Sequence, residues 1–360
     1  MYQVQITDKD AGQRLDKYLH RILPKAGSGF IYKMLRKKNI TLNDKKADGS
    51  ERIVEGDSVT IYFSDETLAK FMGRRIIADS GAKHAEKVSV RHTGSDQERI
   101  TERETDYIAA YHKIQGVHIL YENDHVLLAD KPSGILSQKA ARNDFSLNEW
   151  LIGYLLTSGV VTEDELLAFK PSVCNRLDRN TSGIVLCSKT LQGARLLGDV
   201  LKNRTLHKYY RLYVKGVVED EHLIEGYLTK DEEHNQVYIE PVKTQVKAKS
   251  LDEIKSSYIK TGYRPIKAER DKTLLEVELF TGKTHQIRAH LASIGHPLLG
   301  DPKYGDTAWN EEYRKKYHVR SQLLHAYKVV FPQLDEPFGD LSGRTFTAEL
   351  PEIFNTVKEK

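Results

Sequence analysis

The sequence has too little of several features to support whole classes of protein. It contains only two cysteines, Cys174 and Cys187, in 360 residues, which is too few for a disulfide framework or a cysteine-based zinc site. No apolar run approaches the roughly 18 residues that a helix needs to cross a bilayer. The first residues, MYQVQITDKD, lack the basic-then-apolar pattern of a secretory signal. We therefore expect a cytoplasmic protein without a membrane segment or a structural metal.

Net charge is small in total but unevenly distributed. The formal charge of the chain is +4, and residues 1–63 alone hold 12 basic against 8 acidic side chains. Between Arg14 and Lys46 there are ten basic side chains and two acidic ones. A basic surface on a small unit suits a nucleic-acid backbone, although a solvated charged face is the commoner origin of such a run. Composition alone leaves both interpretations open.

Residues 12–63 have the periodicity of two helices followed by short strands. RLDKYLHRIL and FIYKMLRKK each carry apolar residues at helical spacing, and the second turns its basic residues outward. Alternating residues with turn signals then follow up to residue 63. This stretch resembles the RNA-binding domain of the fourth small-subunit ribosomal protein, called here the S-four-like domain. The resemblance implies RNA contacts by Arg14, Lys17, Lys33, Arg36, Lys37 and Lys38.

Residues 64–117 are polar, mixed in charge and poorly periodic. A loop this long is uncommon inside one compact domain, so we predict a linker over 64–117 with one short helix near Glu66–Met72. The predicted domains are then 1–63 and 118–360. Strand and helix patterns are intermixed in the second domain, which favours an α+β fold. Its expected strands are 125–130, 184–188, 207–216 and 273–280, and its expected helices begin after Ser146 and Thr190.

Polar residues gather at the ends of these elements. The loop 175–183 contains Asp178, and an aspartate in a turn usually bonds its own backbone, so residue type alone favours an ordinary structural role. Alternation along 207–216 puts Tyr210 on the inner face and Tyr209 on the outer face. Most inward tyrosines belong to the core.

The segment 281–301 predicts a helix that Thr284 caps and that Gly295 and Pro297 terminate. Its expected buried face consists of Ile287, Leu291 and Ile294. Arg288 lies beside this face, so its guanidinium would be partly desolvated and would need a carboxylate, for which Asp178 is a candidate. His285 and His290 are five residues apart, which argues against a metal-binding pair.

In this order, the clusters resemble the RluA-type pseudouridine synthases, whose pattern is an HRLDxxTSG loop, a KxY strand and a GRTHQIRxH helix leading to GHPxxGD. This chain has NRLDRNTSG, Lys208-Tyr209-Tyr210, GKTHQIRAH and GHPLLGD. The likeness spans residues 117–335, and a set of motifs is far more specific than a single one. Asn175 in place of His and Lys283 in place of Arg depart from the pattern and leave substrate contacts open.

The resemblance implies a mixed, mainly antiparallel central sheet with flanking helices. It also implies that Asp178 is the catalytic carboxylate, Tyr210 the active-site tyrosine and Arg288 the ion-pair partner of the aspartate. The same motifs imply a set of substrate-binding residues: Arg176, Leu177, Thr181, His285 and Gln286.

Pseudouridine formation breaks the uracil–ribose bond, turns the base and rejoins it through carbon, so neither a cofactor nor a metal is expected. The carboxylate could stabilise charge at the anomeric carbon, attack that carbon or remove a ribose proton, and the sequence does not choose among these. We expect Arg288 to hold Asp178 ionised, Tyr210 to pack on the uracil ring, and the target uridine to leave its stack.

An S-four-like domain joined to such a catalytic domain favours large-subunit ribosomal RNA over tRNA as the substrate, and we expect a monomer. Two other functions remain open. A non-catalytic RNA-binding or ribosome-assembly factor would not need Asp178, Tyr210 and Arg288 together. A glycoside hydrolase would usually need two carboxylates in its cleft.

Overall fold

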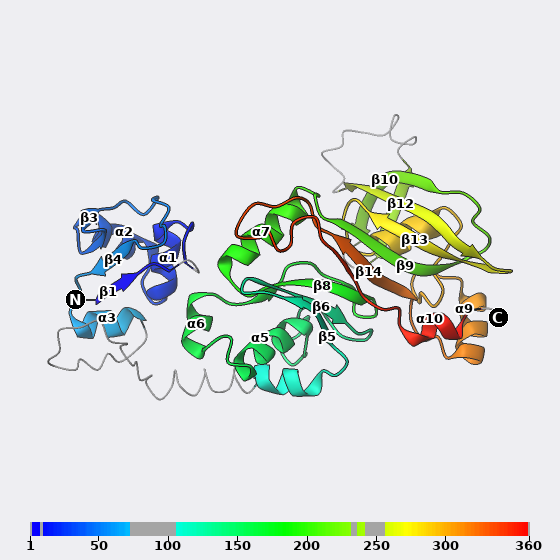
Figure 1. Cartoon of the computed structure of the whole chain (residues 1–360), viewed down its shortest axis with the longest axis horizontal. Coiled ribbons are helices and arrows are strands. Elements are labelled where there is room, and N and C mark those ends of the chain that lie inside the picture. The colour runs from blue at the N-terminus through cyan, green and yellow to red at the C-terminus, as the bar shows by residue number, and fades with distance from the viewer. Residues whose placement is uncertain (1, 8–9, 73–105, 232–235, 242–255, 359–360) are drawn as a thin grey trace.

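The structure, a computed structural model, describes residues 2–7, 10–72, 106–231, 236–241 and 256–358. These residues form two units, and each has its own sheet and its own buried core (Figure 1). Within the described chain, the first unit ends at residue 72 and the second begins at residue 106.

The first unit packs helices against a small antiparallel sheet. Its described elements are β1 (Tyr2–Gln5), α1 (Leu15–Ile22), α2 (Ser28–Arg36), β2 (Ile40–Leu42), β3 (Lys45–Lys46), β4 (Ser58–Ile61) and α3 (Asp65–Met72). The strands lie in the order β1-β4-β2-β3. The apolar stripes of α1 and α2 bury Leu15, Leu19 and Leu35 completely, as the helical spacing predicts. Strand β1 was not predicted, although Tyr2 and Val4 alternate with glutamines along it.

The expected linker over 64–117 is folded at both ends. Helix α3 contributes Leu68 and Met72 to the core of the first unit. Residues 106–113 are helical, and the ring of Tyr111 lies 5.8 Å from that of Trp150 in the second unit. The short helix predicted near Glu66–Met72 is confirmed as α3. The helix over 106–113 was not predicted, because a short apolar face is hard to recognise within a highly charged segment. Residues 73–105 of the expected linker lie outside the described residues.

The second unit is built on a long mixed sheet, in which eleven of the described strands take part. The main path runs β11-β10-β12-β13-β9-β14-β8-β6-β5. Strand β14 runs parallel to β8, and the other described pairs are antiparallel, so the predicted mainly antiparallel α+β fold is confirmed. The strands are β5 (His118–Glu122), β6 (Val126–Lys131), β7 (Ser172–Val173), β8 (Ser182–Ser188), β9 (His207–Lys215), β10 (His222–Asp231), β11 (Gln236–Pro241), β12 (Ser256–Ala268), β13 (Lys272–Leu279), β14 (Leu324–Val330) and β15 (Thr345–Thr347).

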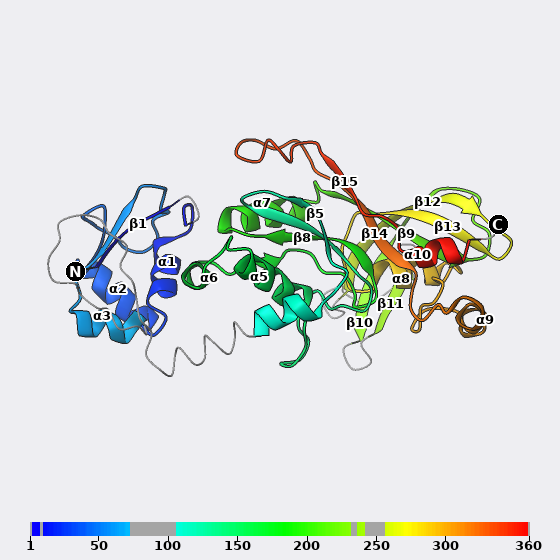
Figure 2. The ribbon, with the colours of Figure 1, turned by 60° about the horizontal axis from the view of Figure 1, so that its bottom comes forward.

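Helices cover both faces of this sheet. The described ones with printed bounds are α5 (Leu147–Thr157), α6 (Glu163–Ala168), α7 (Leu191–Lys202), α8 (Gln286–Ser293), α9 (Thr307–Tyr317) and α10 (Glu352–Thr356). Leu127 of β6 joins the core that contains Leu151 of α5, whereas its neighbour Leu128 joins the core that contains Leu197 of α7. Alternation along the strand thus separates two cores, and Figures 1 and 2 show α5 and α7 on opposite sides of β6 and β8.

The sequence predicts helices that begin after Ser146 and Thr190, with Ser146 as the cap of the first, and both helices are present. The side chain of Thr190 caps α7 by accepting a hydrogen bond from the amide of Gly193. Ser146 precedes α5 but makes no side-chain cap, because its hydroxyl donates to Glu149 instead. Thr284 does not cap α8, since His285 occupies the N-cap position with a φ of 55°. The predicted caps at Ser146 and Thr284 are therefore wrong, because Ser146 bonds to Glu149 and His285 takes the N-cap position of α8.

The predicted buried face of α8 is also partly wrong. Ile287 and Leu291 are buried, but Ile294 is 38% exposed. Ile294 is the C-cap residue, where the chain turns out of the helix toward Gly295, so helical spacing no longer controls its direction.

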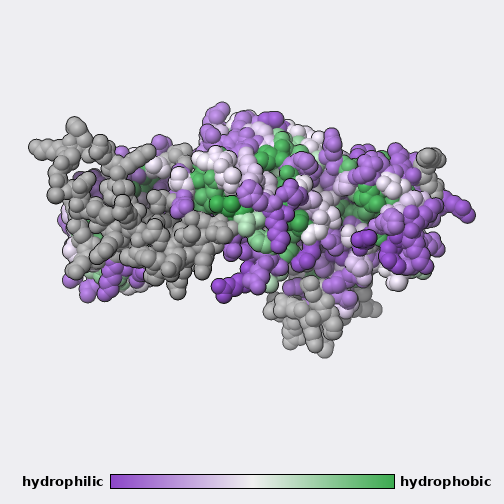
Figure 3. All heavy atoms as spheres, turned by 90° about the horizontal axis from the view of Figure 1, so that it is seen from below, coloured by the Kyte–Doolittle hydropathy of each residue, from purple (hydrophilic) through white to green (hydrophobic). Residues whose placement is uncertain are grey.

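The face of the molecule shown in Figure 3 is largely hydrophilic. Figure 3 shows one face of the molecule, on which apolar residues form separate small patches among polar ones. Among the described residues, no helix combines the length and apolar character needed to cross a membrane.

Candidate active site

A cleft of about 1030 Å³ lies where the loop 174–181 meets the start of α8 and the inner face of β9. Its described lining holds one carboxylate, that of Asp178. Six cationic side chains share that lining: Lys139, Arg176, Arg179, Lys208, Lys283 and Arg288. Cationic side chains around a single carboxylate suit a polyanionic polymer, one monomer of which reaches the carboxylate.

The backbone of the Asp178 loop is held on both sides of the aspartate. Before it, Leu177 donates its amide to the hydroxyl of Ser137 at 3.0 Å, and the same hydroxyl donates to the carbonyl of Leu177 at 2.9 Å. After it, the amide of Thr181 returns to the carbonyl of Asp178 at 3.0 Å. The carboxylate itself is 28% exposed and faces the cleft. A side chain on a loop fixed in this way keeps its direction.

Lys131 anchors the same loop from beneath. Its ammonium group is fully buried and donates to the carbonyls of Pro132 at 3.0 Å, Ile135 at 2.8 Å and Arg179 at 3.1 Å. Arg179, which supplies the third carbonyl, directly follows Asp178 in the chain. The three donors of the ammonium are thus all used, and they tie the turn after β6 to the loop.

Gly183 explains the glycine that ends the NRLDRNTSG motif. Its φ is +111°, and a Cβ atom there would lie 2.2 Å from the carbonyl oxygen of Ala326 on β14. Only glycine permits the parallel strands β8 and β14 to approach this closely, and this approach brings the end of the loop into the sheet.

The guanidinium of Arg288 joins two carboxylates. Its Nη1 donates to Asp178 Oδ2 at 2.8 Å, while Nε and Nη2 donate to the two oxygens of Asp301 at 2.7 and 2.8 Å. Burial acts to lower the pKa of Arg288, but the bonds and charges of the two aspartates raise it overall. The predicted ion pair between Arg288 and Asp178 is therefore present, with Asp301 as a second, fully buried partner.

His285 lies beside this pair. Its Nε2 is 3.9 Å from Asp178 Oδ2, and its Nδ1 is 3.0 Å from the hydroxyl of Tyr304. Burial lowers the pKa of His285, so the ring is neutral at pH 7. His290, by contrast, points to Thr261, so the two histidines of the motif serve different neighbours.

Tyr210 lines the cleft from β9, as its inward position predicts. The residue is 6% exposed, and it packs in the core with Leu212 and Val277. Burial raises the pKa of the Tyr210 hydroxyl, and the charge of Asp178 raises it further. The hydroxyl is therefore protonated at neutral pH and available as a hydrogen-bond donor beside the carboxylate.

All five residues predicted to bind substrate line the cleft, but they differ in what their side chains can still do. Arg176 is exposed, whereas Leu177 and Thr181 are buried. Gln286 bonds to Thr281, Lys283, Lys260 and Thr261. These contacts use the donors and acceptors of its amide, which favours a scaffold role over direct contact with a substrate.

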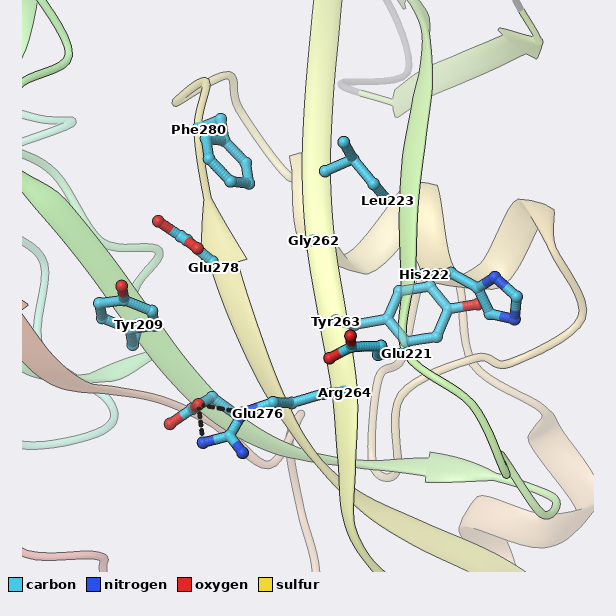
Figure 4. Close-up of a pocket in the computed structure, with 10 residues that line it drawn as sticks. All are labelled: Tyr209, Glu221, His222, Leu223, Gly262, Tyr263, Arg264, Glu276, Glu278 and Phe280. Atoms are coloured by element: carbon cyan, nitrogen blue, oxygen red, sulfur yellow. Dashed lines mark hydrogen bonds and ion pairs between the residues drawn. The ribbon is translucent and has the colours of Figure 1, made fainter.

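A second hollow, of about 320 Å³, lies over the opposite face of the sheet, where Tyr209 rather than Tyr210 projects (Figure 4). Its lining contains Glu221, Glu276 and Glu278. Arg264 pairs with Glu276 at 2.5 Å, and Figure 4 marks this pair with dashed lines. This acidic surface does not suit a polyanion. The chemistry expected from the motifs therefore belongs to the larger cleft.

Comparisons with known proteins agree with this geometry. The family model described as RNA pseudouridylate synthase matches residues 125–293, which contain the Asp178 loop, Tyr210 and Arg288. Over these residues, the chain is similar to RNA pseudouridine synthases. It is 28% identical to a ribosomal large subunit pseudouridine synthase C of Rickettsia bellii, with 96% of each chain covered. It is also 28% identical to a ribosomal large subunit pseudouridine synthase D of Neisseria meningitidis serogroup A, covering 95% of this chain and 76% of the relative.

A solved structure of human RNA pseudouridylate synthase domain containing 4 shares the fold. It matches with a TM-score of 0.52 and 19% identity, over 70% of this chain and 95% of the human one. The predicted pseudouridine synthase fold is thus confirmed by a structural neighbour of low sequence identity.

In the first unit, the basic residues predicted to bind RNA are all exposed. They lie on or next to α1 and α2: Arg14, Lys17, Lys33, Arg36, Lys37 and Lys38. Arg14 forms a bidentate pair with Asp16 at 2.9 and 3.1 Å, which partly neutralises it. The cations at the end of α2 make the more continuous positive surface.

Sequence reasoning missed several residues that shape the site. Asp301 belongs to the GHPLLGD motif, but no role was predicted for it. A buried guanidinium beside one exposed carboxylate signals that a second carboxylate pairs with it. Tyr304, three residues later, carried no motif signal of its own. The two departures from the family pattern take different positions: Asn175 bonds the backbone of Leu186 at 2.7 Å, whereas Lys283 is exposed on the cleft wall.

Proposed function

We propose that this chain converts uridines of large-subunit ribosomal RNA to pseudouridine, with Asp178 as the catalytic carboxylate. The observation that carries the proposal is the single acid of a six-cation cleft, held 2.8 Å from Arg288. A hydrolase with paired carboxylates would need a second acid in the same lining. The ribosomal substrate is supported by the names of the two bacterial relatives, and the expected cytoplasmic location fits such a substrate.

In the proposed reaction, the target uridine leaves its stack and enters the cleft between Asp178 and Tyr210. Asp178 acts on the ribose, while Arg288 holds its Oδ2 at 2.8 Å. Tyr210 packs on the uracil ring and offers its protonated hydroxyl to the base as it turns. The exposed cations of the cleft, Arg176 and Lys283 among them, contact phosphates. The N1–C1′ bond breaks and a C5–C1′ bond forms between the same two fragments. C5 loses its proton to solvent and N1 gains one, so the product is an isomer and the reaction needs no cofactor.

The first unit is proposed to be an S-four-like RNA-binding domain. Its support is the RLDKYL opening on α1, the exposed cations at the end of α2, and a compact core that presents those cations outward. Phosphate contacts of this kind position an RNA without reading its sequence. Selection of the uridine would then combine RNA shape with base flipping in the second unit.

Tritium release from RNA labelled at carbon 5 of uracil tests the proposal. Asp178→Asn keeps the shape of the side chain but removes its charge, and release should fall at least about a thousandfold, the scale of losing a principal catalytic group. Asp199→Asn, an exposed aspartate on α7, is the matched control and should keep full activity. If Asp178→Asn releases tritium at the wild-type rate, the assignment of Asp178 fails.

Mapping pseudouridines in a strain that lacks this protein identifies the substrate. Loss of sites from large-subunit ribosomal RNA is expected. Loss from tRNA alone would correct the substrate but keep the reaction, and no loss from any RNA would favour a binding or assembly factor.

A further inference from the structure

We infer that Tyr304 is a positioning residue that fixes His285 in the tautomer with its proton on Nε2, the nitrogen that faces Asp178. The inference deepens the proposed function, because it concerns the histidine beside the proposed catalytic carboxylate. Tyr304 follows the GHPLLGD motif and contacts β11, His285 and Arg288. It therefore links the outer part of the sheet to the centre of the cleft.

The positions of the protons follow from which groups can donate. The backbone amide of Val237 on β11 can only donate, and it lies 3.0 Å from the hydroxyl oxygen of Tyr304. That oxygen therefore acts as an acceptor, and its own proton is directed to a different partner. His285 Nδ1, at 3.0 Å, lies where it can accept that proton. A neutral imidazole carries one proton, so an accepting Nδ1 leaves the proton on Nε2.

This tautomer has a consequence at Asp178. Nε2 of His285 lies 3.9 Å from Oδ2, the same oxygen that accepts Nη1 of Arg288. A proton on Nε2 turns a positive dipole toward this oxygen, while the opposite tautomer would turn a lone pair toward a carboxylate. The hydrogen bond from Arg288 and the dipole of His285 then both act on Oδ2. Oδ1 therefore stays the more basic oxygen for the ribose.

The rest of Tyr304 is held as rigidly as its hydroxyl. Its backbone amide donates to Asp301 Oδ1 at 3.1 Å, and the guanidinium of Arg288 lies 5.3 Å from the centre of its ring. The ring also packs against the small apolar cluster of Val237 and Ala289. A side chain fixed at both ends can set the orientation of a neighbour.

Nitrogen-15 NMR of histidine-labelled full-length protein tests the inference, with the His285 signals assigned by their loss in His285→Gln. In the wild type we expect a protonated Nε2 and an unprotonated Nδ1. Tyr304→Phe keeps the ring and removes the hydroxyl, so His285 should become a mixture of its two tautomers. Its kcat should fall about tenfold, the scale of losing an orienting partner, with KM within about twofold of the wild type.

Tyr313→Phe is the matched control, because Tyr313 is another packed tyrosine whose hydroxyl makes hydrogen bonds, to Asp271 at 3.0 Å. It should alter neither the His285 spectrum nor kcat. A wild-type spectrum with the proton on Nδ1 overturns the inference, as does a Tyr304→Phe protein with the spectrum and kcat of the control. The tautomer is measured without RNA, so absence of synthase activity would count against the proposed function and not against this assignment.

Discussion

At the scale of single residues, the site depends on one guanidinium between two carboxylates. Arg288 is only 6% exposed, and a buried charge is tolerated when its donors are paired. Asp301 takes two of the bonds and is itself bonded by the amides of Lys303 and Tyr304. Burial acts to raise the pKa of Asp301, but the bonds from Arg288 lower it overall. Asp301 therefore fixes Arg288, and Arg288 fixes Asp178.

Arg288→Lys should separate charge from geometry. A lysine keeps the positive charge but cannot bridge two carboxylates with a planar fork. We expect kcat to fall about a hundredfold, the scale of losing one preorganised donor. We also expect the free energy of unfolding to fall by about 2 kcal/mol, somewhat below the loss from breaking a buried pair outright. Tritium release and urea unfolding measure the two effects.

Arg314→Lys is the control for this prediction. Arg314 on α9 also makes a two-bond pair, with Glu311 at 2.6 and 2.7 Å, but its side chain is 59% exposed. An exposed pair contributes little, so neither quantity should change measurably. Equal losses in the two variants would mean that the fork of Arg288 has no special role.

At the scale of elements, two neutral histidines fasten the strands and helix around the cleft. His290 on α8 meets the hydroxyl of Thr261 on β12 at 3.1 Å. His325 on β14 meets the hydroxyl of Ser182 on β8 at 2.8 Å. Burial lowers the pKa of each to about 4, from an ordinary value of 6.5. Both contacts therefore depend on rings that stay uncharged.

These histidines should make the fold sensitive to acid. Between pH 6.5 and pH 4 the unfolded chain binds protons that the folded histidines do not, so stability is lost as the pH falls through this window. Each histidine accounts for about 3 kcal/mol at most. At pH 5.5, unfolding should take up about 0.9 proton per histidine, which calorimetry in buffers of different ionisation enthalpy measures.

His325→Asn should reduce that uptake by about 0.9 proton and flatten the loss of stability. Proton uptake that is unchanged in this variant would show that His325 is already charged in the folded protein. His118→Asn, at an exposed position on β5, is the control for the substitution itself.

At the scale of the whole molecule, we propose that two of the described basic surfaces face the RNA. One is the wall of the cleft, and the other is the end of α2 in the first unit, where Lys33, Arg36 and Lys37 are exposed. The hollow on the opposite face of the sheet is acidic. An RNA should therefore contact the first unit and the cleft while it avoids that face.

Replacing Lys33, Arg36 and Lys37 together by alanine should weaken RNA binding and reduce its dependence on salt. If each cation contacts one phosphate, the slope of log affinity against log salt should become less negative by about 2 to 3. The turnover rate at saturating RNA should be unchanged, because the cleft is intact. Filter binding at several salt concentrations measures the slope.

Three consecutive cations at the end of α9 provide the control: Arg314, Lys315 and Lys316. Their replacement by alanine removes the same charge from a different exposed helix. An equal change of slope in both triple variants would attribute binding to net charge alone, and the basic surface of α2 would lose its proposed role.

Much of the fold is visible in the sequence, because the period of apolar residues reports which face of an element is buried. The helix over RLDKYLHRIL, the helix that begins after Thr190 and the inward position of Tyr210 all follow from local spacing. The same reasoning gave wrong helix caps where a side chain had another local partner. Ser146 bonds to Glu149, and His285 rather than Thr284 occupies the N-cap of α8. Strand β1 and the helical residues 106–113 were missed because their signals are short.

By itself, the sequence determined the chemistry that could occur: an aspartate, a tyrosine and an arginine in recognisable motifs, together with a basic first unit. Only the tertiary structure decided which groups meet. Asp178 and Arg288 are 110 residues apart in the chain, and Asp301 and Tyr304 enter the site because the turn after α8 folds back under the guanidinium. Spacing along a chain carries the period of a helix or strand, but contacts between distant segments depend on how their buried faces pack.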